Sequence, residues 1–163
     1  MVDLGCAPGG WTQVAVERVR SREGPGAVVA VDIEETEPIA GAVILRGDLR
    51  DPEVTAAIKA ALGGLADVVL SDMAPSTTGH AATDHLRIVA LVEAASSVAV
   101  EILRPGGAFV AKVFKGGAEG VLLAQLKQQF SELRHAKPPA SRAESAETYV
   151  VAKGFLGRRL VAE

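Results

Sequence analysis

The stretch MVDLGCAPGGWTQ, residues 1–13, decides the fold that this sequence predicts. Residues 1–4 are typical of the end of a buried strand, and residues 5–10 form a glycine-rich loop that leads into a helix. Because glycine has no Cβ atom, such a loop can turn sharply and let the backbone approach a ligand closely. The stretch therefore predicts an α/β domain that holds a nucleotide-like ligand beside its first strand.

Further strands and helices alternate along the rest of the chain. Five runs are rich in valine and apolar at consecutive positions: 27–33, 42–48, 67–73, 107–114 and 148–155. Continuous apolarity indicates strands that are buried on both faces, as in a parallel sheet covered by helices. Apolar residues recur at helical spacing in the segments 11–21, 51–62, 84–103 and 118–130. We therefore expect a doubly wound α/β sheet, whose ligands bind at the carboxyl ends of its strands.

Capping residues mark the expected helix boundaries. Asp51 before Pro52 predicts an N-cap with proline in the first turn. The glycines at 63–64 and the Pro-Gly-Gly run at 105–107 predict where the second and third helices stop. Residues 86–100 form the longest apolar stretch, but polar residues interrupt it, and a membrane span needs roughly 18 apolar residues. We interpret it as a core helix.

The composition is that of an ordinary globular domain. The chain has 163 residues, 48% of them hydrophobic and 23% charged, which suits a single domain over residues 1–163. Its start lacks the basic and apolar regions of a secretory leader. The single cysteine, Cys6, cannot form an internal disulfide and has no adjacent histidine, so we interpret it as a small buried residue. We expect a cytoplasmic monomer with no membrane partner.

Charge is distributed unevenly along the chain. Residues 1–100 carry 7 Lys and Arg against 14 Asp and Glu, which is a net charge of −7. Residues 101–163 carry 10 against 6, which is +4, so the whole chain has a net charge of −3. Two explanations are open: a chance fluctuation on a solvated surface, or a basic face in the C-terminal half that attracts phosphates.

Polar residues stand where the predicted strands end. In chain order the strand ends carry the glycine loop, Asp32, Asp48 and Asp72, and the next strand carries Lys112. Asp32 follows Gly10 by 22 residues, the spacing at which a carboxylate meets a ribose diol. The loop lacks the GxGxxG spacing of nicotinamide enzymes, and the bulky Trp11 begins its helix. This pattern favours an adenosine ligand without phosphates, such as S-adenosylmethionine, over a dinucleotide.

Six motifs resemble those of one family. They are VDLGCAPGGWTQ, VDI, GDLRD, LSDMAPSTTG, LRPGGAFVAKVFKG and ASRAESAETYVVAKGF, which follow one another from residue 2 to about residue 155. Together they resemble the FtsJ-like ribose 2′-O-methyltransferases of ribosomal RNA. The resemblance implies a Rossmann-like S-adenosylmethionine-dependent methyltransferase fold, a mostly parallel sheet with one antiparallel strand beside the fifth strand. The run 148–155 matches that antiparallel strand.

The resemblance also implies roles for individual residues. It implies that S-adenosylmethionine, the expected cofactor, is bound by Gly5, Gly9, Gly10, Trp11, Asp32, Asp48 and Asp72. Within this set, Asp32 matches the ligand of the ribose hydroxyls and Asp48 the ligand of the adenine amino group. The family's catalytic set is Lys-Asp-Lys-Glu, whose last three members match Asp72, Lys112 and Glu147. We hypothesise that Lys112 acts on the ribose 2′-hydroxyl, while the two acids position it and the substrate.

The family's first catalytic lysine lies on a segment upstream of the first strand, and that segment also helps to bind RNA. Since this sequence starts inside the strand, we expect the N-terminal segment to be absent and the catalytic set reduced to three residues.

The substrate class implied by the resemblance is RNA, with a uridine of large-subunit ribosomal RNA as the expected target. Three other functions stay open: a transfer-RNA methyltransferase of the same family, a catalytically impaired RNA- or cofactor-binding module, and a nicotinamide-dependent oxidoreductase. Five basic residues are candidates for phosphate contacts: Lys115, Lys137, Arg142, Arg158 and Arg159.

Each candidate residue also has a structural interpretation. Lys112 can be a surface lysine whose stem lies along the sheet, and Asp72 can cap the turn before Pro75. Glu147 can be a solvated loop carboxylate, with Glu144 nearby as a poorer match to the motif. Trp11 can simply pack in the core. The histidines lack the spacing of metal ligands, so no metal is expected.

Overall fold

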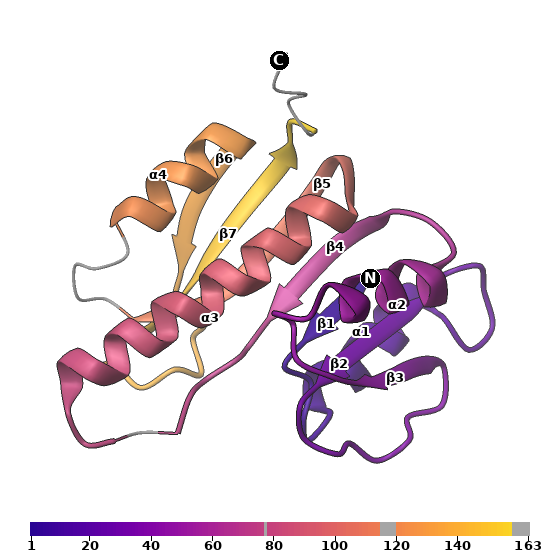
Figure 1. Cartoon of the computed structure of the whole chain (residues 1–163), viewed down its shortest axis with the longest axis horizontal. Helices are drawn as coiled ribbons and strands as arrows, with labels where there is room; N and C mark the ends of the chain where they lie inside the picture. The colour runs from indigo at the N-terminus through magenta and orange to yellow at the C-terminus, as the bar shows by residue number, and fades with distance from the viewer. Residues whose placement is uncertain (77, 115–119, 158–163) are drawn as a thin grey trace.

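A seven-stranded mixed sheet forms the centre of the molecule, in the order β3-β2-β1-β4-β5-β7-β6 (Figure 1). This computed structural model describes residues 1–76, 78–114 and 120–157. The strands are β1 (Val2–Leu4), β2 (Val28–Asp32), β3 (Ala42–Arg46), β4 (Ala66–Ser71), β5 (Leu103–Phe114), β6 (Phe130–Ala136) and β7 (Glu147–Phe155). β7 is antiparallel to both of its neighbours, and the other described pairs are parallel. The expected Rossmann-like sheet, with one antiparallel strand beside β5, is confirmed.

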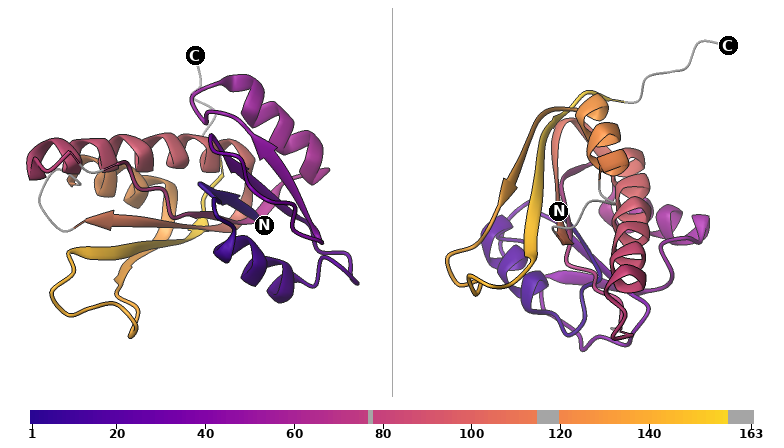
Figure 2. Two further views of the ribbon diagram at one scale, coloured as in Figure 1. Left: turned by 90° about the horizontal axis from the view of Figure 1, so that it is seen from below. Right: turned by 90° about the vertical axis from the view of Figure 1, so that its left-hand side faces the viewer.

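Helices pack on both faces of the sheet. They are α1 (Gly10–Val19), α2 (Pro52–Leu62), α3 (Ala81–Ile102) and α4 (Gly120–Gln129). α2, α3 and α4 lie on one face, and among the described helices α1 alone lies on the other (Figure 2). The main core lies under the first three and includes Phe109, Ile102 and Leu126, each fully buried. Within the described residues, no helix is both long and apolar enough to cross a membrane.

The boundaries of α2 follow the capping residues of the sequence. The Asp51 side chain accepts a hydrogen bond from the Glu53 backbone N–H at 2.9 Å, and Pro52 occupies the first turn. At the other end, Gly63 adopts the left-handed conformation with a φ of 70°, and its N–H donates to the Lys59 carbonyl. The predicted N-cap and C-cap are therefore confirmed.

The third and fourth predicted helices are present with small differences at their ends, and one strand was not predicted. The expected helix over 118–130 is present as α4 from Gly120 to Gln129, with residues 118 and 119 outside the described residues. The strand β6, which the sequence analysis did not predict, follows at the sheet edge. Most side chains of this edge strand are exposed and polar, so it lacks an apolar run that would reveal it. The third helix ends at Ile102, ahead of the Pro-Gly-Gly run at 105–107. That run lies within β5, where the register against β4 shifts between Ala66 and Val68.

Burial on both faces, expected for every strand, holds for only part of the sheet. β1 and most of β2 are fully buried, whereas buried and half-buried residues alternate along the carboxyl half of β5 and along most of β7. The half-buried face of these two strands carries Lys112 and Tyr149 as directly opposed partners. These two side chains therefore stand on the more open face of the sheet.

Candidate active site

One edge of the sheet gathers the carboxyl ends of the parallel strands β3, β2, β1, β4 and β5 (Figure 1). The residues predicted at the strand ends lie along this edge, because each stands at or just beyond the end of its strand. They are the glycine loop after β1, Asp32 at the end of β2, Asp48 after β3, Asp72 after β4 and Lys112 near the end of β5. The topology therefore places side by side groups that are distant in sequence.

At two positions of the glycine loop, a side chain would clash with neighbouring atoms or strain the backbone. Gly5 has a φ of 78°, and a Cβ atom there would lie 2.2 Å from the Cγ atom of Met73. Gly9 has a φ of 121° and precedes α1, and a Cβ atom there would lie 2.8 Å from the Cδ1 atom of Ile39. Gly10 differs, since a Cβ atom on it would meet nothing within 4 Å. The loop thus needs glycine at Gly5 and Gly9 for its own shape, whereas the space beside Gly10 is open.

Asp32 connects this loop to the end of β2. Its Oδ2 atom accepts a hydrogen bond from the Ala7 backbone N–H at 2.9 Å, and Oδ1 accepts one from the Glu34 backbone N–H at 2.9 Å. An ionised carboxylate has about four lone-pair positions, so both oxygens keep acceptor capacity for a ligand hydroxyl.

A buried carboxylate that the sequence analysis missed lies on β1, just before the loop. Asp3 on β1 is fully buried, and its Oδ2 atom accepts a hydrogen bond from the Thr12 hydroxyl of α1 at 2.6 Å. Its Oδ1 atom has no hydrogen-bond partner among the described residues. Burial raises the pKa of Asp3, more than the Thr12 hydrogen bond lowers it. The signal in the sequence was an acidic residue inside an otherwise apolar strand.

Lys112, Asp72 and Glu147 form one cluster of charges. The Nζ atom of Lys112 lies 3.0 Å from Oδ1 of Asp72 and 3.9 Å from Oε1 of Glu147. The Lys112 side chain is only 12% exposed, compared with 28% for Asp72 and 42% for Glu147. The structure thus brings together the three residues predicted as catalytic, and the lysine is the most sheltered of them.

Tyr149 joins this cluster and was also missed by the sequence analysis. Its hydroxyl donates a hydrogen bond to Oδ1 of Asp72 at 3.2 Å, and its ring centroid lies 5.5 Å from that of Trp11. The available signal was spacing, because residues two apart on a strand share a face and Tyr149 follows Glu147 by two positions. Trp11, for which core packing was the structural alternative, is half-buried against this tyrosine.

Asp48 makes a local ion pair at the far end of the edge. Both carboxylate oxygens accept hydrogen bonds from Nε of Arg50, at 2.9 and 3.1 Å. The hydrogen bonds from Arg50 lower the pKa of Asp48 to about 2. The carboxylate therefore stays ionised at neutral pH, and a ligand that used it would share it with Arg50.

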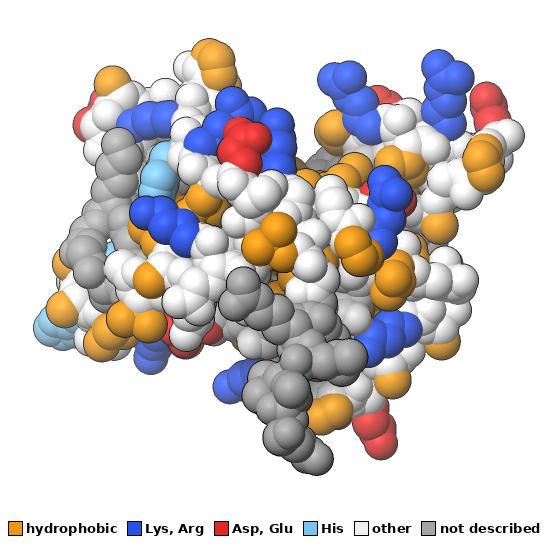
Figure 3. Space-filling view, turned by 90° about the horizontal axis from the view of Figure 1, so that it is seen from above, with side chains coloured by type: hydrophobic (Ala, Val, Ile, Leu, Met, Phe, Trp, Pro, Cys, Tyr) orange, Lys and Arg blue, Asp and Glu red, His pale blue; other side chains and the backbone are white. Residues whose placement is uncertain are grey.

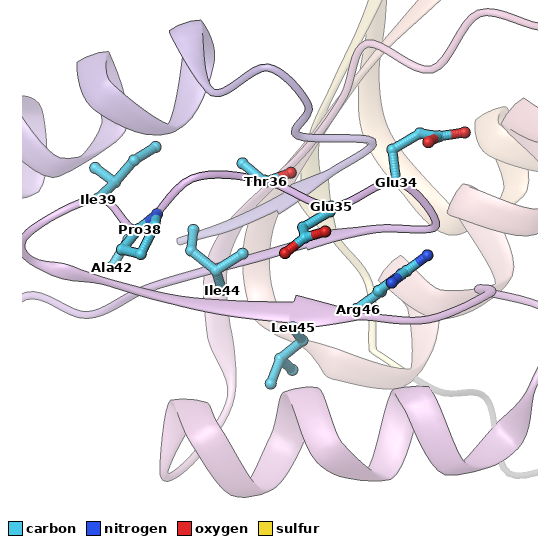
Figure 4. A pocket seen from close by; sticks show the side chains of 9 residues that line it. All are labelled: Glu34, Glu35, Thr36, Pro38, Ile39, Ala42, Ile44, Leu45 and Arg46. Carbon is cyan, nitrogen blue, oxygen red and sulfur yellow. The ribbon is translucent and has the colours of Figure 1, made fainter.

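A hollow of about 440 Å³ lies between β3 and the segment 34–39 (Figure 4). Its lining mixes charged and apolar side chains, among them Glu34, Ile44 and Arg46, and Figure 4 shows Leu45 pointing the other way, toward α2. None of the Lys112 cluster lines this hollow. It lies beside the strand-end edge rather than at its charged centre.

Basic side chains do not gather into one continuous face in the view of Figure 3, where acidic groups lie among them. Of the basic candidates, Lys137 donates to the carbonyls of Ala143 and Ser145 at 3.0 and 2.8 Å, so its ammonium braces the loop before β7. Arg142 is exposed in that loop. Lys115, Arg158 and Arg159 lie outside the described residues.

Comparisons with known proteins agree on one family. The model of the FtsJ-like methyltransferases matches residues 1–155. A ribosomal RNA large subunit methyltransferase E from Paramagnetospirillum magneticum is 62% identical over 159 residues, covering 96% of this chain and 65% of the relative. The enzyme of the same name from Granulibacter bethesdensis is 56% identical over 155 residues, covering 95% and 65%. The chain thus spans about two thirds of the length of these relatives.

Solved structures show the same fold. A crystal structure assigned as a ribosomal RNA methyltransferase from Plasmodium falciparum superposes with a TM-score of 0.84 at 28% identity, covering 96% of this chain and 86% of that one. Human methyltransferase-like protein 13, in complex with S-adenosylhomocysteine, superposes with a TM-score of 0.62 at 16% identity, covering 99% and 74%. The latter similarity concerns the fold alone.

Proposed function

Since this chain belongs to the FtsJ-like methyltransferase family, we propose that it transfers a methyl group from S-adenosylmethionine to a ribose 2′-hydroxyl of large-subunit ribosomal RNA. The observation that carries this proposal is the contact between Lys112 and Asp72 at the strand-end edge, beside the glycine loop. The names of the relatives, which are 62% and 56% identical, support the ribosomal substrate.

The residues at the edge fit the proposed cofactor. Two backbone N–H groups hold the Asp32 carboxylate at the end of β2, and both of its oxygens can accept a further hydrogen bond. Such a carboxylate suits the two hydroxyls of a ribose. The space beside Gly10 is open, so the backbone there can lie against a ligand. Gly5, Gly9 and Trp11 would shape the loop around it, Asp48 would accept a hydrogen bond from the adenine amino group, and Asp72 would lie next to the methionine portion. When bound, S-adenosylmethionine supplies a methyl group already activated by its sulfonium charge.

The Lys112 cluster would act on the substrate hydroxyl. A ribose hydroxyl is a weak nucleophile at neutral pH, so methyl transfer needs a group that withdraws its proton or stabilises the charge that develops on its oxygen. Lys112 is sheltered, and Asp72 at 3.0 Å and Glu147 at 3.9 Å fix its ammonium group. We assign to Lys112 the contact with the 2′-oxygen, and to the two acids the orientation of the lysine.

Radiolabelled methyl transfer tests the proposal. The purified chain is incubated with labelled S-adenosylmethionine in three separate reactions. The first contains undermethylated large ribosomal subunits, the second their extracted RNA, and the third bulk transfer RNA. We expect label in large-subunit RNA, at a position protected from alkaline cleavage, because a 2′-O-methyl group blocks attack by the 2′-oxygen. Label found only in transfer RNA would show that the substrate is transfer RNA and not ribosomal RNA. Binding of S-adenosylhomocysteine without any transfer would favour a binding module instead.

A further inference from the structure

Tyr149 contacts both halves of the candidate site. Its aromatic ring packs on Trp11, the second residue of the helix that leaves the glycine loop, with a centroid distance of 5.5 Å and an interplanar angle of 35°. Its hydroxyl donates to Oδ1 of Asp72 at 3.2 Å. Among the described contacts, this side chain therefore bridges the cofactor loop and the charged cluster.

Two donors share one oxygen of Asp72. Oδ1 accepts from the Tyr149 hydroxyl at 3.2 Å and pairs with the Lys112 ammonium at 3.0 Å. Both donors come from one face of the sheet, because Lys112 and Tyr149 are directly opposed in the β5–β7 ladder. Two donors from one ladder hold the carboxylate through its Oδ1 atom and restrict it to one rotamer.

The tyrosine hydroxyl stays a donor under ordinary conditions. Burial, and then the negative charge of Asp72, raise the pKa of Tyr149 to about 12. At neutral pH the group is therefore protonated and does not act as a base toward the substrate hydroxyl. Its contribution is orientation.

We propose that Tyr149 is a positioning residue: it holds the Asp72 carboxylate against Lys112 and, through its ring contact with Trp11, couples that carboxylate to occupancy of the glycine loop. The inference rests on the proposed methyl transfer. To that proposed function, the inference adds a path by which a bound cofactor orders the groups that act on the ribose.

Kinetics of two variants separate the hydroxyl from the ring. Tyr149→Phe keeps the ring and removes the donor, so kcat should fall by about tenfold to a hundredfold, the range expected for a hydrogen bond to a charged group. The KM for RNA and the affinity for S-adenosylhomocysteine should stay within about threefold of their original values. Tyr149→Leu removes the ring as well, so S-adenosylhomocysteine should also bind more weakly, by up to about tenfold.

Thr148→Val is the matched control. Thr148 is the adjacent residue of β7, and its hydroxyl donates to the Ala136 carbonyl at 3.0 Å, away from the charged cluster. This variant also loses one hydrogen bond and shows the effect of a structural loss alone. If Tyr149→Phe lowers kcat no more than Thr148→Val does, the proposal is overturned.

An optical measurement works without methyl transfer, since the chain has one tryptophan and one tyrosine and these two are in contact. Absorbance titration of Tyr149, with circular dichroism to confirm that the fold persists, should give an ionisation midpoint well above the ordinary value near 10. The Asp72→Ala substitution should lower this midpoint. The same substitution should change Trp11 fluorescence when it is made in the original chain, but not when it is made in the Tyr149→Phe variant.

The two arms distinguish two failures. If the chain methylates no RNA while the Tyr149 midpoint falls in Asp72→Ala and Trp11 responds as expected, the proposed function fails and the coupling stands. If the midpoint lies at its ordinary value and does not move in Asp72→Ala, the Tyr149 inference fails whether or not methyl transfer occurs.

Discussion

The Nζ atom of Lys112, on β5, lies 3.0 Å from Oδ1 of Asp72, just after β4. The two residues are brought together because β4 and β5 are parallel neighbours, so their carboxyl ends meet at the same edge. The pair is sheltered, with the lysine 12% and the aspartate 28% exposed, which weakens screening by solvent. This contact positions the lysine that we propose to contact the ribose 2′-oxygen.

Replacing Lys112 should abolish catalysis and spare cofactor binding. We expect Lys112→Met to lower kcat by about 10²- to 10⁴-fold, the usual contribution of a positioned group that transfers a proton or stabilises a developing charge. The affinity for S-adenosylhomocysteine, measured by calorimetry, should stay within about threefold. Lys153→Met, at an exposed position of β7, is the control and should behave like the original chain. A kcat of Lys112→Met close to that of the original chain would exclude the role assigned to this lysine.

Glu147 should matter less than Asp72. Its carboxylate lies 3.9 Å from Nζ of Lys112 and is 42% exposed, so its hold on the ammonium is looser and more screened. We expect Glu147→Gln to lower kcat by less than about tenfold, within the range of an exposed ion pair. Glu144→Gln, in the preceding loop, should have no effect on single-turnover rates. A larger loss for Glu144→Gln than for Glu147→Gln would reverse the choice between the two.

Two glycines of the loop should respond differently to alanine. Gly5→Ala places a Cβ atom 2.2 Å from Cγ of Met73 at a positive φ, so it should lower stability by about 1–3 kcal/mol and weaken S-adenosylhomocysteine binding. Gly10→Ala meets nothing within 4 Å at the start of α1, and alanine favours helix by roughly 0.5–1 kcal/mol. Its melting temperature should hold or rise. Weaker ligand binding by a fully stable Gly10→Ala would mark a direct ligand contact.

The buried Asp3–Thr12 pair makes a prediction about stability. Thr12→Val removes the hydroxyl that bonds Asp3 and should cost about 1–3 kcal/mol in urea unfolding, because a buried acceptor loses its partner. Thr55→Val, at a buried threonine of α2, serves as the comparison. An equal loss of unfolding free energy in the two variants would show that the hydrogen bond to Asp3 contributes no more to stability than an ordinary buried threonine does.

Asp3 should also make stability depend on pH. Its pKa is raised in the folded state, so the fold binds this proton more tightly than the unfolded chain does. The contribution of Asp3 to stability is therefore most favourable below the unfolded value of 3.8, and it declines as pH rises toward the folded pKa. Asp3→Asn removes this titration. Its stability relative to the original chain should increase as pH rises from 4 to 7, and a pH-independent difference would contradict the assignment.

Asp48 and Arg50 can be tested as a pair. If Asp48 accepts a hydrogen bond from the adenine amino group, Asp48→Ala should weaken S-adenosylhomocysteine binding by about tenfold. Arg50→Ala frees the same carboxylate and should leave binding equal or stronger, as measured by calorimetry. Weaker binding in Arg50→Ala than in Asp48→Ala would show that the guanidinium, not the carboxylate, meets the ligand.

Local sequence patterns determined much of this protein. The glycine loop before α1, the apolar runs of β1 and β2, the caps of α2 and the acids at the strand ends were all readable, because each depends on neighbouring residues and on the rule that parallel strands end at one edge. Even the antiparallel strand 148–155 was found through the resemblance of its motif.

The tertiary structure alone decided which side chains meet. The edge strand β6 has no apolar run, the hydroxyl of Thr12 covers a carboxylate buried in β1, and Tyr149 lies between Trp11 and Asp72. Contacts of this kind depend on strand order and on the register of β7 against β5, which a single sequence does not reveal since a one-residue slip turns every side chain to the opposite face.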